Sequence, residues 1–140
     1  MTQPARARDT DQLTPEELAH AIVELAADRK AVDIVQLDLR GMIGYTDYFV
    51  VCSGRTERQT KAIHDAIYEG LKSAYGRLPE RVEGLPGARW ILMDYLDVVV
   101  HIFTPAVRDF YRLEALWGEA PSRQLEAPEP ESQPEPVAGA

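Results

Sequence analysis

The sequence predicts one α/β domain, a mixed β-sheet flanked by helices in the order α-β-β-α-β-β-β-α. Segments with apolar residues at helical spacing alternate along the chain with short segments typical of strands. The 140 residues, 45% of them hydrophobic, suffice to bury one core. A strand, a helix and a further strand in succession imply a right-handed crossover. We therefore expect a sandwich in which helices pack on the sheet.

Composition divides the chain into three parts. Residues 1–12 are polar and of mixed charge, and predict a disordered lead-in. Residues 13–118 contain every predicted helix and strand. Residues 119–140, rich in proline and glutamate, predict a disordered tail, whose five glutamates and one arginine account for −4 of the formal net charge of −8. The predicted domain is therefore only mildly acidic.

The first predicted helix follows the lead-in directly. In TPEELAHAIVELAADRK, Thr14 suits the N-cap, Pro15 suits the first helical position, and Glu17 completes a capping box. Apolar residues then recur at helical spacing: Leu18, Ala21, Ile22, Leu25 and Ala26. One face of this helix is therefore expected to pack on the sheet.

Two strands and a second helix come next. DIVQLDL, residues 33–39, alternates like a half-buried strand, whereas YFVVC, residues 48–52, is apolar throughout and predicts a central strand covered on both faces. Cys52 is the only cysteine, so an internal disulfide is excluded and a buried apolar role is expected. Thr56 and Gln59 suggest a second capping box at the start of the second helix.

The stretch WILMDYLDVVVHIF, residues 90–103, predicts a β-hairpin with its tip at residues 96–97, preceded by a short strand at RVE. In this register Met93 faces Val100 on the side of the core. The other face carries Trp90, Leu92, Asp94, Val99, His101 and Phe103. A last helix is expected from Thr104 through AVRDFYRLEALW.

One enzymatic interpretation is nucleotidyl transfer, with Asp47, Asp94 and Asp97 as Mg²⁺ ligands and residues 53–54 as a phosphate-binding turn. The carboxylates would have to converge, but Asp94 is expected on one face of the hairpin and Asp97 in its turn. A Ser-Gly pair is also common wherever a strand turns into a helix. Catalysis is therefore the minor interpretation, and we expect neither a metal ion nor a cofactor.

The net charge indicates the class of partner. Nucleic-acid binding requires a clustered basic face, so an acidic chain predicts little direct contact with nucleic acid and favours a basic protein partner. No apolar run reaches the roughly 18 residues that a membrane span requires. The N-terminal MTQPARARDTDQ lacks the apolar stretch of a signal peptide. We therefore expect a cytoplasmic protein without membrane contact.

The second face of the hairpin is the candidate binding surface. Apolar and aromatic residues beside a carboxylate and an imidazole match the composition of a protein-binding hot spot. In the alternative interpretation, helices bury Trp90 and Phe103, Asp94 caps a neighbouring backbone group, and His101 is an ordinary packed histidine. The periodicity of the sequence favours neither interpretation over the other.

Four ordered blocks of the sequence resemble the ribosomal silencing factor family, also called the Iojap family. They are TDYFVVCSG at residues 46–54, ERQ at 57–59, RWILMDYLDVVVHIF at 89–103 and RDFYRLEALWG at 108–118. Together they extend over roughly residues 14–118, which is the whole of the predicted domain.

The resemblance implies a mixed α/β sandwich related in fold to nucleotidyltransferases, without their established catalytic activity. It implies a translation repressor that binds the large ribosomal subunit through its fourteenth large-subunit protein. Bound there, it would sterically block joining of the small subunit, especially under nutrient limitation. Occlusion of this kind requires no chemistry, and acidic character suits a basic ribosomal protein better than RNA. A homodimer through the same apolar face would be compatible with this function off the ribosome.

Carried over to this sequence, the resemblance assigns partner binding to the hairpin. The family's tryptophan and aspartate match Trp90 and Asp94, and its VVVH block matches residues 98–101. We therefore expect a partner-binding surface formed by Trp90, Leu92, Asp94, Tyr95, Asp97, Val99 and His101. Leu96 departs from the pattern, since the family commonly has glycine there. Because leucine tolerates a positive φ badly, the sequence predicts a different turn at the tip.

Overall fold

The computed structural model describes residues 13–42, 44, 46–112 and 122–125. Its centre is a six-stranded mixed sheet with the strand order β3-β4-β5-β2-β1-β6. The elements in chain order are α2 (Pro15–Asp28), β1 (Val32–Asp38), β2 (Tyr48–Ser53), α3 (Glu57–Tyr75), β3 (Arg81–Glu83), β4 (Trp90–Asp94), β5 (Val98–Phe103), α4 (Pro105–Tyr111) and β6 (Ser122–Leu125). The predicted α/β class and the predicted order of its eight elements are confirmed, and β6 is an added strand.

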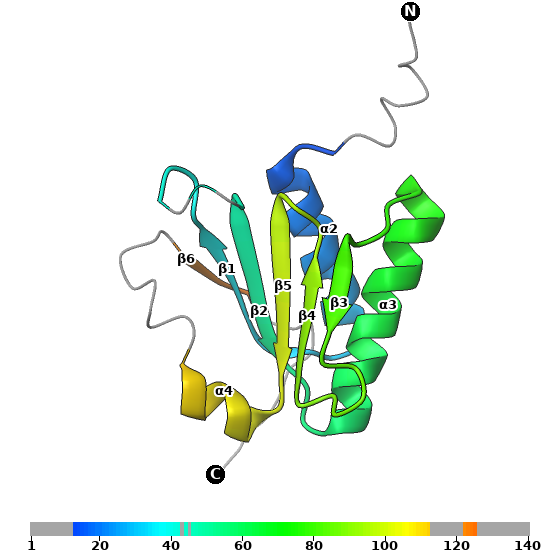
Figure 1. Ribbon diagram of the computed structural model, residues 1–140, viewed down its shortest axis with the longest axis vertical. Coiled ribbons are helices and arrows are strands. Elements are labelled where there is room, and N and C mark those ends of the chain that lie inside the picture. Colours follow the sequence, from blue (N-terminus) through cyan, green and yellow to red (C-terminus); the bar gives the residue numbers. More distant parts are fainter. Residues whose placement is uncertain (1–12, 43, 45, 113–121, 126–140) are drawn as a thin grey trace, which may run out of the picture.

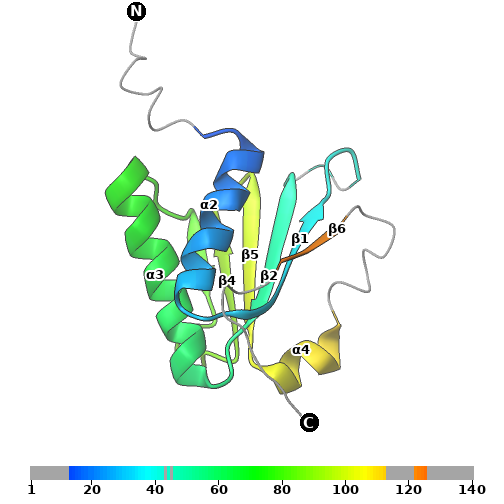
Figure 2. The same cartoon turned by 180° about the vertical axis from the view of Figure 1, so that it is seen from behind.

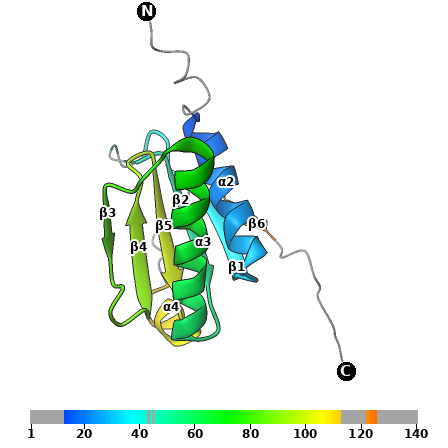
Figure 3. The same ribbon diagram turned by 90° about the vertical axis from the view of Figure 1, so that its right-hand side faces the viewer.

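The two faces of the sheet are covered unequally. The central strands β2 and β5 are parallel, and all other neighbouring strands are antiparallel. The long helices α2 and α3 lie on the same face of the sheet, as Figures 2 and 3 show. Among the described elements, only the short helix α4 lies on the opposite side, at one end of the sheet (Figure 1). We call this less covered side of the sheet the outer face.

The N-terminus of α2 has the predicted capping box. The Thr14 hydroxyl accepts a hydrogen bond from the Glu17 N–H at 3.1 Å, and the Glu17 carboxylate accepts one from the Thr14 N–H at 2.9 Å. Pro15 occupies the first helical position, as predicted, because it has no N–H that would need a partner there. Local sequence therefore fixes where α2 begins.

The start of α3 differs in part from the prediction. Thr56 caps the helix by accepting from the Gln59 N–H at 3.1 Å. The Gln59 side chain, however, accepts from the Arg55 N–H at 2.9 Å instead of completing a capping box with the Thr56 backbone. Its amide group donates to the carbonyls of Arg29 and Lys30 at 3.0 and 3.1 Å. Gln59 thus ties the start of α3 to the end of α2.

Two cores result from this arrangement. The larger one lies between the sheet and the helices α2 and α3, and the smaller one lies on the outer face. All six residues of β2 are buried, which confirms the prediction of a central strand covered on both faces. Cys52 lies in this strand with 0% exposure, as expected for a small apolar residue. No described helix is long and apolar enough to cross a membrane.

The predicted tail contains one strand. Residues 122–125 pair antiparallel with β1, so that Leu125 lies opposite Ile34 and Ser122 opposite Leu37. The prediction of a tail without structure is therefore wrong for these four residues. Pairing uses backbone groups at the free edge of β1, and it does not require the apolar alternation on which the prediction depended. Residues 1–12, the last part of the predicted final helix and the remainder of the tail lie outside the described residues.

Candidate partner-binding site

The β4–β5 hairpin has the predicted register. Asp94 lies opposite Val99, Leu92 opposite His101, and Trp90 opposite Phe103. Because side chains alternate along a strand, all six lie on the outer face, away from α2 and α3. The parallel pairing of β5 with β2 extends this face across the sheet. The side that the sequence proposed as a binding surface is therefore the one without a long helix among the described elements.

Of the six hairpin residues on the outer face, the three on β4 are the more exposed, as judged from the residues that the structure describes. Trp90, Leu92 and Asp94 are half-buried, whereas Val99 and His101 are only 4% and 5% exposed. The structure therefore corrects the assignment of Val99 and His101 as contact residues: they lie beneath the surface because side chains of the neighbouring strands β4 and β2, such as Trp90 and Phe49, pack around them. We call Trp90, Leu92 and Asp94 the β4 strip.

A buried aromatic group supports Trp90. Its indole N–H donates to His101 Nδ1 at 3.1 Å, so the imidazole proton lies on Nε2. The indole also packs against Phe103, with ring centroids 4.9 Å apart, and the His101 ring meets the Phe49 ring edge-on at 4.7 Å. Burial lowers the pKa of His101 to about 4. The histidine is therefore neutral at pH 7 and holds Trp90 by a hydrogen bond without bearing charge.

Asp94 caps a neighbouring backbone group, as one interpretation of the sequence expected, and its carboxylate also reaches the surface. One carboxylate oxygen accepts a hydrogen bond from the Leu96 N–H at 2.8 Å, which caps the hairpin turn. The other lies 3.6 Å from Arg81 Nε on the neighbouring strand β3, and the Asp94 side chain is 21% exposed. The carboxylate therefore shapes the turn and also presents negative charge at the surface.

The hairpin tip contradicts the prediction that Leu96 would avoid a positive φ by forming a different turn. This leucine has a φ of +74°, the left-handed conformation that was expected to require glycine. The Asp94 cap and the hydrogen bond from the Tyr95 N–H to the Val98 carbonyl, at 2.9 Å, close the turn on both sides of it. The surrounding hydrogen bonds thus impose the tight turn in spite of the side chain, which is 55% exposed.

Tyr95 and Asp97, the two remaining residues of the expected surface, lie outside the β4 strip. Tyr95 points to the opposite side, where it is 1% exposed and belongs to the core under α2 and α3. Burial raises the pKa of its hydroxyl. The assignment of Tyr95 as a partner contact is therefore corrected, because strand alternation places it inside. Asp97 is half-buried at the tip, 4.0 Å from Arg77 Nη2, and its carboxylate remains accessible beside the strip.

The residues of the nucleotidyl-transfer interpretation do not converge. Asp47 donates its N–H to the Asp97 carbonyl at the hairpin end of the sheet, whereas Ser53 ends β2 at the other end. Ser53 lies six positions beyond Asp47 along β2, which corresponds to roughly 20 Å at the rise of a β-strand. Among the described residues, no group of three or more histidine, cysteine, aspartate or glutamate side chains is arranged to hold a metal ion.

The Ser-Gly turn has a packing role. A Cβ atom on Gly54 would lie 2.8 Å from the Thr60 backbone nitrogen, so glycine lets the loop pass close to α3. Arg108 Nη1 donates to the Ser53 hydroxyl at 2.9 Å. A hollow of about 720 Å³ adjoins this serine, and its charged lining residues are Asp33, Arg108, Asp109 and Arg112. The sequence did not predict this hollow, because β1, β2 and α4 form it together. Its charged lining is balanced, with two acidic and two basic side chains.

The β4 strip presents an aromatic residue, an aliphatic residue and a carboxylate at the surface of this α/β fold. A family model described as "Ribosomal silencing factor during starvation" matches residues 12–139. The chain therefore belongs to the ribosomal silencing factor family, as the four sequence blocks predicted. This family supports a role in ribosome-associated regulation of translation, and it is not a known family of enzymes.

Individual relatives agree with this assignment. The ribosomal silencing factor of Zymomonas mobilis is 38% identical over 104 residues, which cover 74% of this chain and 77% of the relative. The mouse protein named mitochondrial assembly of ribosomal large subunit protein 1 is 31% identical over 98 residues, 69% of this chain and 43% of that protein. A crystal structure of a Chromobacterium violaceum protein superposes with a TM-score of 0.73 at 36% identity, covering 84% of this chain and 98% of that one.

Proposed function

We propose that this protein represses translation by binding the large ribosomal subunit through its fourteenth large-subunit protein. Bound there in the cytoplasm, it sterically blocks joining of the small subunit, especially when nutrients are limiting. The observation that carries this proposal is the β4 strip: a half-buried tryptophan, leucine and aspartate on a sheet face where no long helix is described. The strip combines an aromatic anchor with apolar surroundings and a charged edge, as binding hot spots do.

The charge around the strip suits a basic protein partner. Four carboxylates lie on or beside β3, β4 and the hairpin tip, against two arginines: the residues are Glu80, Glu83, Asp94, Asp97, Arg77 and Arg81. Complementary charge of this kind orients partners and raises the rate at which they associate. The name of the mouse relative, which refers to assembly of the large ribosomal subunit, supports that subunit as the target.

The first test is co-sedimentation of the purified protein with isolated large subunits, isolated small subunits and joined ribosomes. We expect binding to free large subunits alone, and a smaller fraction of joined ribosomes when the protein is added before the small subunit. Binding to small subunits, or binding to large subunits without an effect on joining, would contradict occlusion. Light scattering over a concentration series would show whether a homodimer through the outer face competes with this binding.

Truncation of Trp90 tests the site. We expect Trp90→Ala to weaken binding to the large subunit by at least about 2 kcal/mol, or roughly 30-fold in Kd, because it removes the anchor of the strip. Tyr68→Ala is the matched control, since Tyr68 is a half-buried aromatic residue on α3 at the opposite side of the sheet. A folded Trp90→Ala protein with unchanged affinity would exclude the β4 strip as the docking surface.

Two substitutions of Asp94 separate its charge from its structural role. Asp94→Asn keeps an oxygen that can cap the Leu96 N–H and removes the negative charge, whereas Asp94→Lys loses the cap and reverses the charge. If charge contributes to docking, both variants bind large subunits more weakly, and the loss for Asp94→Asn shrinks as salt is raised. Full binding by Asp94→Asn would leave capping as the only role of this carboxylate.

A further inference from the structure

The basic side chains of the folded body gather at one end of the molecule. Four segments meet there: residues 28–33, 53–58, 84–89 and 104–112. They contain seven basic and four acidic residues, whereas the rest of residues 13–112 contains five basic and eleven acidic ones. A chain with a formal charge of −8 thus has a local excess of positive charge. We call its seven basic residues the basic end: Arg29, Lys30, Arg55, Arg58, Arg89, Arg108 and Arg112.

Hydrogen bonds between the segments hold this end together. The Gln59 side chain donates to the Lys30 carbonyl at 3.1 Å, joining α3 to the end of α2. The Gly54 N–H donates to the last carbonyl of β5 at 2.9 Å, and the Thr104 N–H donates to the Arg89 carbonyl at 2.9 Å. The four segments are therefore neighbours in space although they are distant in sequence.

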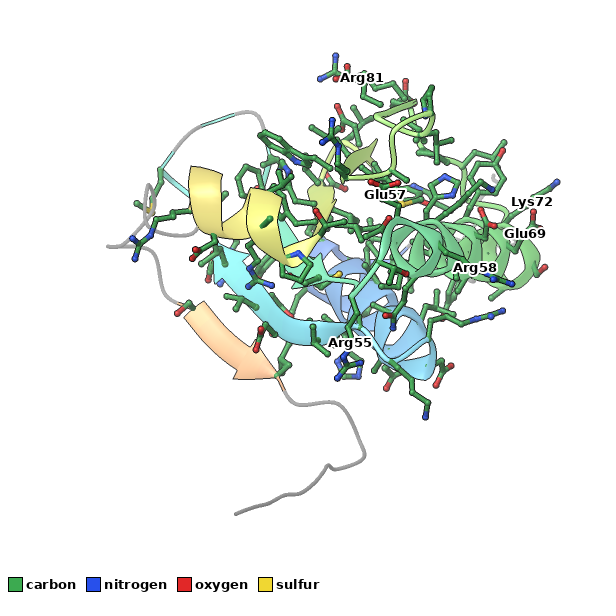
Figure 4. The ribbon with its side chains drawn as sticks, turned by 90° about the horizontal axis from the view of Figure 1, so that it is seen from below. Arg55, Glu57, Arg58, Glu69, Lys72 and Arg81 are labelled. Carbon is green, nitrogen blue, oxygen red and sulfur yellow. The ribbon has the colours of Figure 1, made fainter. Side chains whose placement is uncertain are left out.

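Three arginines of the basic end lack the ion pairs that most other basic side chains of residues 13–112 form with described residues. Elsewhere between residues 13 and 112, four of the five basic side chains lie within 4.0 Å of a carboxylate: Arg40 with Asp38, Lys61 with Asp65, Arg77 with Asp97, and Arg81 with Asp94. At the basic end, Arg55, Arg58 and Arg89 are exposed and have no ion pair with any described residue. Figure 4 looks at this end and shows Arg55 and Arg58 at the start of α3. Their charge is thus available to a partner.

We propose that the basic end binds the phosphate backbone of RNA. Six of its seven residues are arginines, whose planar guanidinium groups match phosphate oxygens through paired hydrogen bonds. Cations contributed by four segments suit a polyanion with charges at regular intervals, and the release of its counterions favours binding. The net charge of the sequence predicted little contact with nucleic acid, because a net charge does not report how charges are distributed in the fold.

This RNA contact would add to the proposed function. It rests on that function in one respect only, the choice of ribosomal RNA as the biological ligand. The β4 strip would bind a protein, and the basic end would bind RNA beside it. An acidic protein surface is the competing occupant, because arginine also pairs with carboxylates. The probes are therefore a short, labelled RNA duplex of mixed sequence and poly-glutamate, with no ribosomal protein present.

The test compares two double variants that each remove two positive charges. Arg55→Gln with Arg58→Gln alters the basic end, and Lys72→Gln with Arg81→Gln is the matched control elsewhere on the surface (Figure 4). Binding of the full chain to the duplex is measured by fluorescence anisotropy as salt is raised. We expect the first variant to bind the duplex about tenfold more weakly at low salt. The slope of the logarithm of the binding constant against the logarithm of the salt concentration should fall in magnitude by about two. The control should bind like wild type.

Arg89→Gln, on another segment of the basic end, provides a second test of the same surface. It should reduce the magnitude of the same slope, of binding constant against salt concentration, by about one. No binding of wild type to the duplex at low salt, an equal loss in both double variants, or equally tight binding of poly-glutamate would each overturn the proposal. Trp90→Ala should bind the duplex normally. If the wild-type protein bound the duplex but did not bind large subunits, only the proposed function would be refuted.

Discussion

At the scale of single residues, His101 shows how the core sets the charge of the outer face. A charged imidazolium is poorly solvated inside the sheet, so burial lowers its pKa to about 4. The same imidazole accepts the Trp90 N–H through Nδ1, and protonation of Nδ1 would break this hydrogen bond. The orientation of the proposed anchor therefore depends on a neutral histidine.

His101 predicts a dependence of stability on pH. The unfolded chain binds a proton at His101 below an ordinary pKa of about 6.5, whereas the folded chain does so only near pH 4. Stability from the neutral imidazole is therefore complete above pH 6.5 and is lost as the pH falls toward 4. Between pH 7 and pH 5 we expect this residue to remove about 2 kcal/mol from the free energy of unfolding.

The measurement is urea unfolding of wild type and His101→Gln at both pH values. Glutamine does not titrate, and its side-chain oxygen can accept the Trp90 N–H. His20 and His64 are present in both proteins, so their contributions cancel in the comparison. Between pH 7 and pH 5, the free energy of unfolding should fall by about 2 kcal/mol more for the wild type than for the variant. Equal losses would show that the imidazole is not held neutral by burial.

At the scale of elements, the β4–β5 hairpin contains a strained turn. A left-handed backbone costs about 1–2 kcal/mol for a residue with a side chain, while glycine gives back about 0.5–1 kcal/mol through the entropy of the unfolded chain. Leu96 has this conformation and loses little packing when it is removed, since it is 55% exposed. Leu96→Gly should therefore raise the free energy of unfolding by about 0.5–1 kcal/mol.

Leu78→Gly is the control for this prediction. Leu78 is 49% exposed, close to the exposure of Leu96, but it does not have a positive φ. Its replacement should destabilise the protein, because the entropic cost of glycine is then not offset by relief of strain. Chemical unfolding of both variants gives the two changes directly. A loss of stability in Leu96→Gly as large as in Leu78→Gly would mean that the turn is not strained.

Local signals in the sequence predicted the elements well, because the causes of those elements are local. The capping residues of α2, the alternation in the hairpin and the apolar run of β2 each act within a few positions. β6 was missed because its pairing with the edge of β1 depends on where a distant strand lies. The left-handed Leu96 was missed because the prediction considered only the conformational preference of leucine, whereas hydrogen bonds from the Leu96 N–H to Asp94 and from the Tyr95 N–H to Val98 hold the turn closed.

At the scale of the whole molecule, the candidate site could be predicted only in part. Strand alternation predicted which residues share the outer face, and it placed Trp90, Leu92 and Asp94 there correctly. It gave no measure of depth, so Val99 and His101 were assigned to the surface although neighbouring strands bury them. The basic end was invisible in the sequence, since four separate segments contribute to it.

The central position of β2 makes Cys52 a probe of the whole fold. Burial raises the pKa of its thiol to about 12, so at pH 8 only about one thiol in ten thousand would be ionised, and the side chain is fully buried. Exposure of Cys52 requires separation of β2 from its neighbours β1 and β5 and from the helices above it. Such an opening is equivalent to global unfolding.

We therefore expect the thiol of the native protein to react with a disulfide reagent at the rate for the unfolded chain multiplied by the fraction unfolded. The rate should rise with urea according to the same m-value as equilibrium unfolding. A Cys52→Ala, Leu96→Cys variant is the control, because its thiol lies at the exposed hairpin tip and should react at once in the native state. Rapid labelling of native Cys52, or a much smaller urea dependence, would indicate that the sheet opens locally at β2 and would contradict a single cooperative core.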